Sequence, residues 1–378
     1  MTPEPFTVAI PQGDIDDLRR RLGATRWADD FGNEDWGYGV ERGWLESMTG
    51  YWADTFDWRA QEAAMNAFPQ YRVEIDGLLI HYVHVRAKTA GAIPLLLTHG
   101  WPWTFRDFAA MIPLLADAGF DVVIPSVPGI AFSPLNRTGV RIPGIADRWV
   151  ALMRDVLGYG PFAAAGGDWG ASITAELGHM HAGHLLGVYL TTATWPGFNP
   201  AQLDTPHFTH AEQWMLDRVN AVGGVGLGAP TIQRIGQQTL AYAMVDSPVG
   251  TAAWLWERRR AWSDCDGDVL AVFDRDFLCT TAALYWFTRS IGTSLRLYRD
   301  HYAHGWTARR AGRVVSVPTG FGIYPKDVVF APRALAASAT NLVRWTVMPK
   351  GGHFGPSEQP AALAAELATF FHALRRGP

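Results

Sequence analysis

The sequence predicts an α/β fold whose mostly parallel sheet is covered by helices on both faces. From residue 93 onward, short apolar runs suited to strands buried on both faces alternate with segments of helical period. Between about residues 195 and 305 the strand pattern disappears, and residues 1–70 are helical and rich in tryptophan. Because alternating strands and helices form parallel sheets, we expect a parallel core, a helical insertion and an N-terminal helical extension.

Four segments follow from these boundaries. Residues 1–70 form the extension, which is too short and too rich in tryptophan to fold independently. It should pack on the core and on the helical insertion, here called the cap. Residues 71–194 form the first part of the core, residues 195–305 a helical cap, and residues 306–378 the second part of the core. The cap should lie over the carboxyl edge of the strands, where open α/β sheets bind ligands.

The first part of the core begins with a predicted hairpin at residues 71–85. Its residues follow a period of two, and Asp76 with Gly77 supplies the turn. The elements expected after it are a strand at 93–98, a helix around 105–115, a strand at 122–124, a helix around 144–157 and strands at 162–165 and 186–191. Those expected later are cap helices at 212–219, 250–262 and 280–302, strands at 314–317 and 342–347, and a closing helix at about 361–374.

Composition excludes several classes of function. A net charge of −4 leaves no electrostatic footprint for nucleic acid. Cys265 and Cys279 form no C-x-x-C pair, so neither a disulfide framework nor a zinc site is indicated. Residues 1–17 lack the form of a signal peptide, and no apolar run approaches the ~20 residues of a spanning helix. We therefore expect a soluble, cytoplasmic protein without a membrane anchor; a homodimer is one option for its assembly.

Residues 166–170, with the sequence Gly-Gly-Asp-Trp-Gly, lie between an apolar run and a helical segment. Strand, sharp glycine-framed turn and helix form the setting of the nucleophile elbow of α/β-hydrolases. The glycines permit a strained turn that lifts the central side chain, Asp168, off the sheet. The pattern alone also allows a buried or helix-capping aspartate.

Asp168 stands where a serine hydrolase carries serine, and this exchange narrows the chemistry. A serine that displaced a leaving group at saturated carbon would form an ether, which water does not readily cleave. An aspartate forms an ester, which an activated water can hydrolyse at its carbonyl. Asp168 therefore indicates hydrolytic opening or displacement at an sp³ carbon.

Candidate partners for this nucleophile follow the last strands. The base of an α/β-hydrolase comes after the final strand, and His353 occupies that place with two glycines before it. Asp327 follows the preceding strand and is the candidate acid, with Glu358 as a weaker rival. A surface-loop histidine and a helix-starting aspartate are the alternatives.

Three residues are candidates for donating hydrogen bonds to the oxygens that gain negative charge during the reaction. Trp101 follows the first parallel strand, so that its backbone N–H and that of Trp169 could form an oxyanion hole; Pro102 has no N–H to donate. The phenol of Tyr298, on the last cap helix, could serve a departing oxygen, although helical period alone favours core packing there. Trp101, Trp169 and Tyr298 would also contact the substrate.

With these residues assembled, the whole chain resembles the microsomal-type epoxide hydrolase family, α/β-hydrolases with an added N-terminal domain. The motifs that carry the resemblance are His-Gly-Trp-Pro at 99–102, Gly-Gly-Asp-Trp-Gly at 166–170, Asp-Ser-Pro-Val-Gly at 246–250, Pro-Thr-Gly-Phe at 318–321 and Gly-Gly-His-Phe at 351–354. The resemblance implies that Asp168 is the nucleophile, His353 the base and Asp327 the charge-relay acid. Tyr298 matches one of the family's two oxygen-activating tyrosines.

The chain departs from the family at the other tyrosine, because Ala229 stands at the matching position. Tyr298 would then act alone, or Tyr242 or a water would substitute, or ring opening would be impaired. Mammalian members of that family often carry Glu where Asp327 stands, and they begin with a membrane anchor, which we do not expect here.

The function expected from these observations is hydrolysis of an apolar epoxide, aromatic epoxides included, to a vicinal diol through an ester on Asp168. Water activated by the His353–Asp327 pair would release the product, and no metal or organic cofactor would be needed. The nearest alternative is a haloalkane dehalogenase-like hydrolase, which uses the same kind of elbow. A non-catalytic ligand-binding protein that kept the fold is the second alternative.

Overall fold

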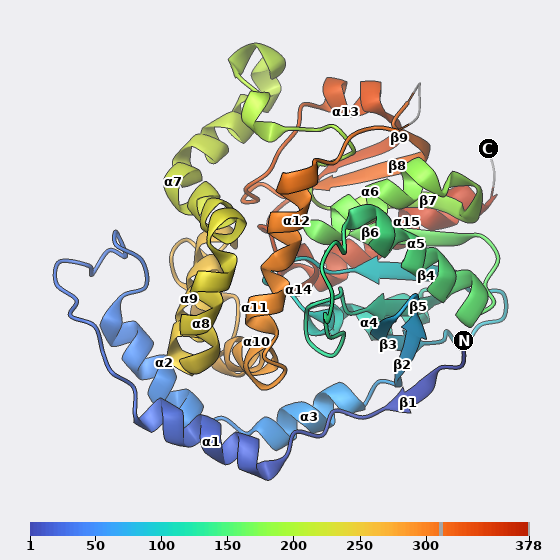
Figure 1. Cartoon of the computed structure of the whole chain (residues 1–378). Helices are drawn as coiled ribbons and strands as arrows, with labels where there is room; N and C mark the ends of the chain where they lie inside the picture. The colour runs from blue at the N-terminus through green and yellow to red at the C-terminus, as the bar shows by residue number, and fades with distance from the viewer. Residues whose placement is uncertain (310–312, 377–378) are drawn as a thin grey trace.

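One sheet of nine strands runs through the residues that the computed structural model describes, 1–309 and 313–376 (Figure 1). The strand order is β1-β2-β3-β5-β4-β6-β7-β8-β9. The pairs β1–β2, β2–β3 and β3–β5 are antiparallel and all the others are parallel, which confirms the predicted α/β class. The strands are β1 Glu4–Phe6, β2 Gln70–Ile75, β3 Leu78–Val85, β4 Ile93–Thr98, β5 Phe120–Pro125, β6 Phe162–Gly166, β7 Leu185–Leu190, β8 Val315–Ile323 and β9 Thr340–Val347.

The turn between β2 and β3 has the predicted form. Asp76 and Gly77 both take positive φ angles, 47° and 70°, as the central residues of a type I′ hairpin turn must. Ile75 pairs with Leu78 across the turn, which fixes the register of the hairpin. The strand β1 was not expected, because its three residues include a proline and carry no alternating pattern.

Helices cover both faces of the sheet, as predicted. On one face α4 (Met111–Asp117) packs against α15 (Pro360–Arg376), and on the other α5 (Ile142–Ala151) packs against α6 (Trp169–Met180). The predicted helix at 105–115 is divided, since a 3₁₀ turn at Phe105–Phe108 precedes α4. Neighbouring residues of β7 face opposite layers: the ring of Tyr189 lies 5.4 Å from that of Phe370 on α15, whereas Val188 faces Gly178 of α6.

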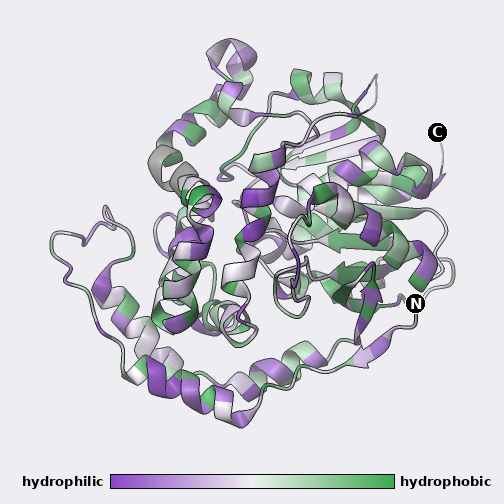
Figure 2. Ribbon diagram, in the orientation of Figure 1, coloured by the Kyte–Doolittle hydropathy of each residue, from purple (hydrophilic) through white to green (hydrophobic). Residues whose placement is uncertain are grey.

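The core is centred on the parallel strands. All five residues of β6 are buried, as expected for a strand covered on both faces. In Figure 2 the central strands are coloured mostly as hydrophobic, whereas the outer helix α1 (Gln12–Gly23) is mostly hydrophilic. Among the described residues, no helix has both the length and the apolar character that crossing a membrane requires.

The chain between β7 and β8 is helical and lies beside the carboxyl ends of the parallel strands (Figure 1). Its α-helices are α7 Gln213–Ile235, α8 Gln237–Asp246, α9 Pro248–Trp262, α10 Arg275–Phe287, α11 Ser290–Ser294 and α12 Arg296–His304. We call this region the cap. The side chains of residues 223–229 lie outside the described part of the structure. The cap was expected to be helical, but α8 had no predicted counterpart.

The N-terminal extension contacts the cap through its tryptophans. Besides α1 it contains α2 (Arg42–Asp54) and α3 (Trp58–Asn66), and it passes along the outer edge of the molecule (Figure 1). Trp44 and Trp52 each lie 5.8 Å, ring to ring, from Trp256 of α9. These edge-to-face contacts bury large apolar surfaces that the extension alone could not cover.

Candidate active site

Asp168 occupies the tip of the turn between β6 and α6. Its φ of 52° and ψ of −126° place the backbone in a region that non-glycine residues rarely adopt. The turn is so tight that a Cβ on Gly170 would lie 1.9 Å from the carbonyl oxygen of Thr98, and one on Gly166 would lie 2.4 Å from the carbonyl oxygen of Gly170. Glycine is therefore required on both sides of the aspartate.

Two backbone amides bind the carboxylate of Asp168. The N–H of Trp101, in the loop after β4, donates to Oδ1 over 2.7 Å, and the N–H of Trp169 donates to the carboxylate as well. Gly100 makes the first approach possible, because a Cβ there would lie 2.4 Å from Oδ1. The N–H of Asp168 itself donates to Oγ1 of Thr192 over 3.0 Å, which fixes the elbow against the loop after β7.

The two other members of the predicted triad meet Asp168 at this edge of the sheet. The ring atom Nδ1 of His353 lies 2.7 Å from Oδ1 of Asp327, and Nε2 lies 3.7 Å from Oδ2 of Asp168. The side chains of His353 and Asp327 are 2% and 3% exposed, whereas that of Asp168 is 22% exposed. Glu358 binds backbone N–H groups and no ring atom of His353, so the structure places Asp327 in the position of the acid.

Burial and neighbouring charges shift the pKa values of His353 and Asp168. Burial alone would lower the pKa of His353, but the carboxylate of Asp327 and its hydrogen bond, with Asp168 beyond, raise the pKa above its usual value. Burial raises the pKa of Asp168, and this rise is opposed by His353 and by the two amides. The pKa values of both groups are therefore raised, that of Asp168 by burial and that of His353 by its carboxylate neighbours.

Tyr298 of α12 lies on the side of Asp168 that faces the cap. Its ring lies edge to face against Trp169 at 4.8 Å and against Trp101 at 5.9 Å, and its side chain is buried. Burial, followed by the charge of Asp168, raises the pKa of Tyr298 well above its usual value, so the phenol stays protonated. The residue predicted to face either pocket or core therefore lies next to Trp101 and Trp169, the two tryptophans whose amides bind Asp168.

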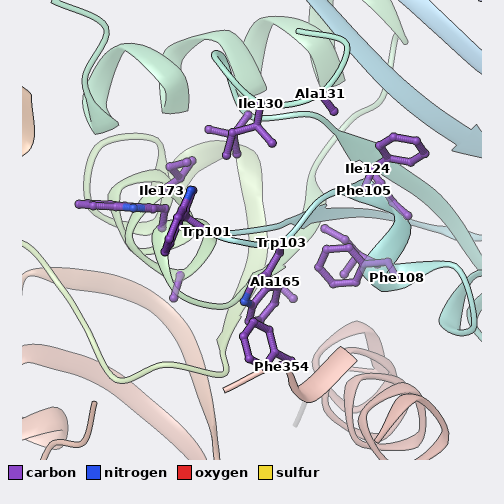
Figure 3. Packing of buried hydrophobic residues seen from close by; sticks show 14 of the residues in the cluster. Trp101, Trp103, Phe105, Phe108, Ile124, Ile130, Ala131, Ala165, Ile173 and Phe354 are labelled. Carbon is purple, nitrogen blue, oxygen red and sulfur yellow. The ribbon is translucent and has the colours of Figure 1, made fainter. Parts of the chain in front are cut away.

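Two further tryptophans enclose His353, and neither was identified from the sequence. The rings of Trp262 and Trp103 lie 5.2 Å and 5.6 Å from the imidazole, and the carbonyl oxygen of Trp262 accepts the backbone N–H of His353 over 2.8 Å. Figure 3 shows Trp101 and Trp103 with Phe354 within one buried cluster. Trp103 could have been noted for its place beside the His-Gly-Trp-Pro motif, but no local signal marks Trp262.

The structure leaves the second oxygen-activating tyrosine without a buried counterpart on α8. The side chain of Tyr242 is 71% exposed on that helix. Tyr242 therefore does not supply a buried phenol in place of the tyrosine that is missing at Ala229. Ala229 lies on α7 among the residues whose side chains are outside the described structure. Within the described residues, no group of three or more His, Cys, Asp or Glu side chains could hold a metal ion.

Family models match both parts of the chain. Residues 93–233 match the model described as alpha/beta hydrolase fold, which agrees with the sheet order and with the elbow at Asp168. The protein is thus an α/β-hydrolase in architecture. Residues 3–108 match the model described as Epoxide hydrolase N terminus.

Individual relatives extend the match to nearly the whole chain. A Stigmatella aurantiaca protein named "Putative epoxide hydrolase" is 38% identical over 98% of this chain and 85% of its own length. Epoxide hydrolase 1 of Sus scrofa is 30% identical over 98% of this chain and 89% of its own length. The structure of Aspergillus niger epoxide hydrolase, 29% identical, superposes with a TM-score of 0.86 over 100% of this chain and 96% of that one. This chain belongs to the epoxide hydrolase family, as the resemblance in its sequence predicts.

Proposed function

We propose that the protein hydrolyses an apolar epoxide to a vicinal diol in two steps, through a covalent ester on Asp168. The observation that carries this proposal is the division of the Asp168 carboxylate: Oδ1 is held by the amide of Trp101, while Oδ2 faces His353. In the first step Oδ2 attacks one carbon of the ring, the C–O bond of that carbon breaks, and an alkyl ester forms.

Tyr298 assists the ring opening. Its phenol is buried beside Trp101 and Trp169 and stays protonated because its pKa is raised by burial and by Asp168. It can therefore donate a hydrogen bond or a proton to the epoxide oxygen as that oxygen gains charge. The indole rings of Trp101 and Trp169 lie edge to face against the same phenol, so the surroundings of its hydroxyl are largely apolar, which favours an apolar or aromatic substituent on the epoxide.

Water releases the product in the second step. Nε2 of His353, oriented by Asp327 through Nδ1, takes a proton from a water that attacks Cγ of Asp168. The negative charge of the tetrahedral intermediate develops on Oδ1, which accepts the N–H of Trp101, and the N–H of Trp169 also binds the carboxylate. The intermediate then collapses and expels Oδ2 with the alkyl group. This oxygen takes the proton from His353 and becomes the second hydroxyl of the diol, and His353 is neutral again.

Replacement of His353 by Gln tests the scheme, because the first step needs only Asp168 and Tyr298. After incubation with an epoxide that the wild type turns over, intact mass spectrometry of H353Q should show one substrate mass added per chain. The matched control is His304→Gln, at the exposed end of α12, which should turn over normally and show no adduct. Absence of the adduct in H353Q would contradict the covalent mechanism.

Membership of the epoxide hydrolase family favours this function over the halide-releasing alternative. A panel of 1-chloroalkanes assayed for chloride release separates the two: we expect no release above the level of an Asp168→Asn variant.

A further inference from the structure

The loop that carries His353 is attached to the cap by its backbone. The N–H of Gly351 donates to Oδ2 of Asp264 over 2.8 Å, and the N–H of His353 donates to the carbonyl oxygen of Trp262, also over 2.8 Å. Both acceptors belong to the turn that ends α9. The position of the proposed base is therefore set in part by a segment that lies much earlier in the chain. Asp264 and Gly351, for example, are 87 residues apart in sequence.

Glu358 binds the remaining N–H groups of this loop. Its Oε2 accepts from Gly352 over 2.9 Å, and its Oε1 accepts from Phe354 over 2.9 Å, so the donors on both sides of His353 end on one carboxylate. The same Oε2 also accepts the N–H of Asp264 over 2.8 Å. One side chain thus joins the base-carrying loop to the cap turn.

Close packing supports the same connection. A Cβ on Gly352 would lie 2.5 Å from the carbonyl oxygen of Trp262 and 2.8 Å from Cα of Ser263, so the cap turn rests directly on the glycine. On its other side the loop is tied to the acid, because the carbonyl oxygen of Gly351 accepts the N–H of Lys326, the residue before Asp327. The loop is held between the cap turn and the acid loop.

We propose that Glu358 and Asp264 are positioning residues that hold His353 for the hydrolysis of the ester, and that the cap turn at 262–264 and the base form one mechanical unit. This inference rests on the proposed function, in which His353 acts only in the second step. The 3.7 Å between Nε2 of His353 and Oδ2 of Asp168 leaves little room for displacement of the ring. A shift of about 1 Å at such a site can cost roughly 100-fold in rate.

Glu358→Gln is the direct test, because an amide of the same shape cannot accept all three N–H groups. In either orientation of the side chain, the NH₂ group of the glutamine faces at least one backbone donor. We expect kcat to fall about 10- to 100-fold while kcat/KM changes less than twofold, since kcat/KM reports steps up to formation of the ester. Rapid-quench mass spectrometry should show the ester accumulating during turnover, which it does not do in an enzyme that has merely lost part of its folded fraction.

A second pair of variants keeps the test decisive if E358Q does not fold. Asp264→Ala removes only the acceptor for Gly351 and should lower kcat in the same selective way. Its matched control is Asp266→Ala, two residues after that turn, whose side chain is 88% exposed and forms an ion pair with Lys326 at 3.5 Å. D266A should keep the wild-type kcat and KM.

The outcomes separate the two proposals. If H353Q traps the ester but E358Q and D264A hydrolyse it at the wild-type rate, the positioning role is wrong and the mechanism stands. A fall of kcat and kcat/KM by the same factor would likewise overturn the positioning role. If H353Q traps nothing, the covalent mechanism itself has failed.

Discussion

The backbone N–H of Trp101 lies 2.7 Å from Oδ1 of Asp168, so the proposed nucleophile occupies its own oxyanion hole before any substrate arrives. The two oxygens of the carboxylate are therefore not equivalent. Oδ1 accepts the N–H of Trp101, whereas Oδ2 has Nε2 of His353 at 3.7 Å. This asymmetry determines which oxygen should reach the product.

Isotope labelling follows directly from that asymmetry. In a single turnover in H₂¹⁸O with enzyme in excess, the diol should contain no label, because its new oxygen is Oδ2 of Asp168. The label should appear instead in the peptide that contains Asp168, measured by mass spectrometry after digestion. Label in the diol of the first turnover would show that water attacks the epoxide directly.

The hydrolysis step should depend on pH through His353. The base must be neutral, so kcat falls as the pH drops through its pKa, which the charge of Asp327 raises against the opposing effect of burial. In Asp327→Asn that charge is gone and burial prevails. We expect the acidic limb of the kcat–pH profile to move to lower pH while the plateau falls. A limb that stays in place would mean that another group titrates.

Loss of the Tyr298 phenol should slow only the first step. Tyr298→Phe keeps the ring against Trp169 but removes the donor for the epoxide oxygen, so ester formation should fall about 10²- to 10⁴-fold. Stopped-flow or rapid-quench measurement of ester formation checks this. The control is Tyr242→Phe, which should behave as wild type because that side chain is 71% exposed. Slower ester formation in the control would place Tyr242 in the chemistry.

The elbow glycine should be essential to stability as well as to activity. In Gly170→Ala the new methyl group would meet the carbonyl oxygen of Thr98 at 1.9 Å, and we expect a loss of roughly 3 kcal/mol in the free energy of unfolding. Gly50→Ala, in the exposed middle of α2 with nothing within 4 Å, should instead gain roughly 0.5–1 kcal/mol. Urea denaturation of both variants provides the measurement; equal effects would show that Gly170 has room for a side chain.

The parallel core could be predicted because its information is local. The apolar run of β4, the Asp76–Gly77 turn and the elbow at 166–170 each carry their pattern within a few residues. The strand β1 could not be found in this way, since its three residues become a strand only by pairing with the edge of β2. The break before α4 also escaped prediction; there Thr104 and Asp107 form a capping box that starts a separate 3₁₀ turn.

In the site, too, residues marked by local sequence patterns could be predicted, whereas those brought together only by folding could not. The candidate nucleophile, base and acid could be ordered along the chain because each follows a recognisable strand. The acceptors that hold the base, Trp262 and Asp264, belong to a helix end with no distinguishing sequence, and only the folded cap brings them to the loop of His353. Glu358 was considered as an alternative to Asp327 for the acid. Its carboxylate instead accepts hydrogen bonds from three backbone N–H groups of the loop and the cap turn.

The tryptophans of the N-terminal extension have a consequence for biosynthesis. Trp44 and Trp52 pack on Trp256, and the hydroxyl of Tyr51 donates to Asp276, a residue 225 positions later in the chain. The extension leaves the ribosome before the cap, yet it reaches its partners only after the cap has been synthesised, and contacts of such long sequence separation form slowly. The extension is therefore made before the cap but is expected to acquire its native surroundings after it.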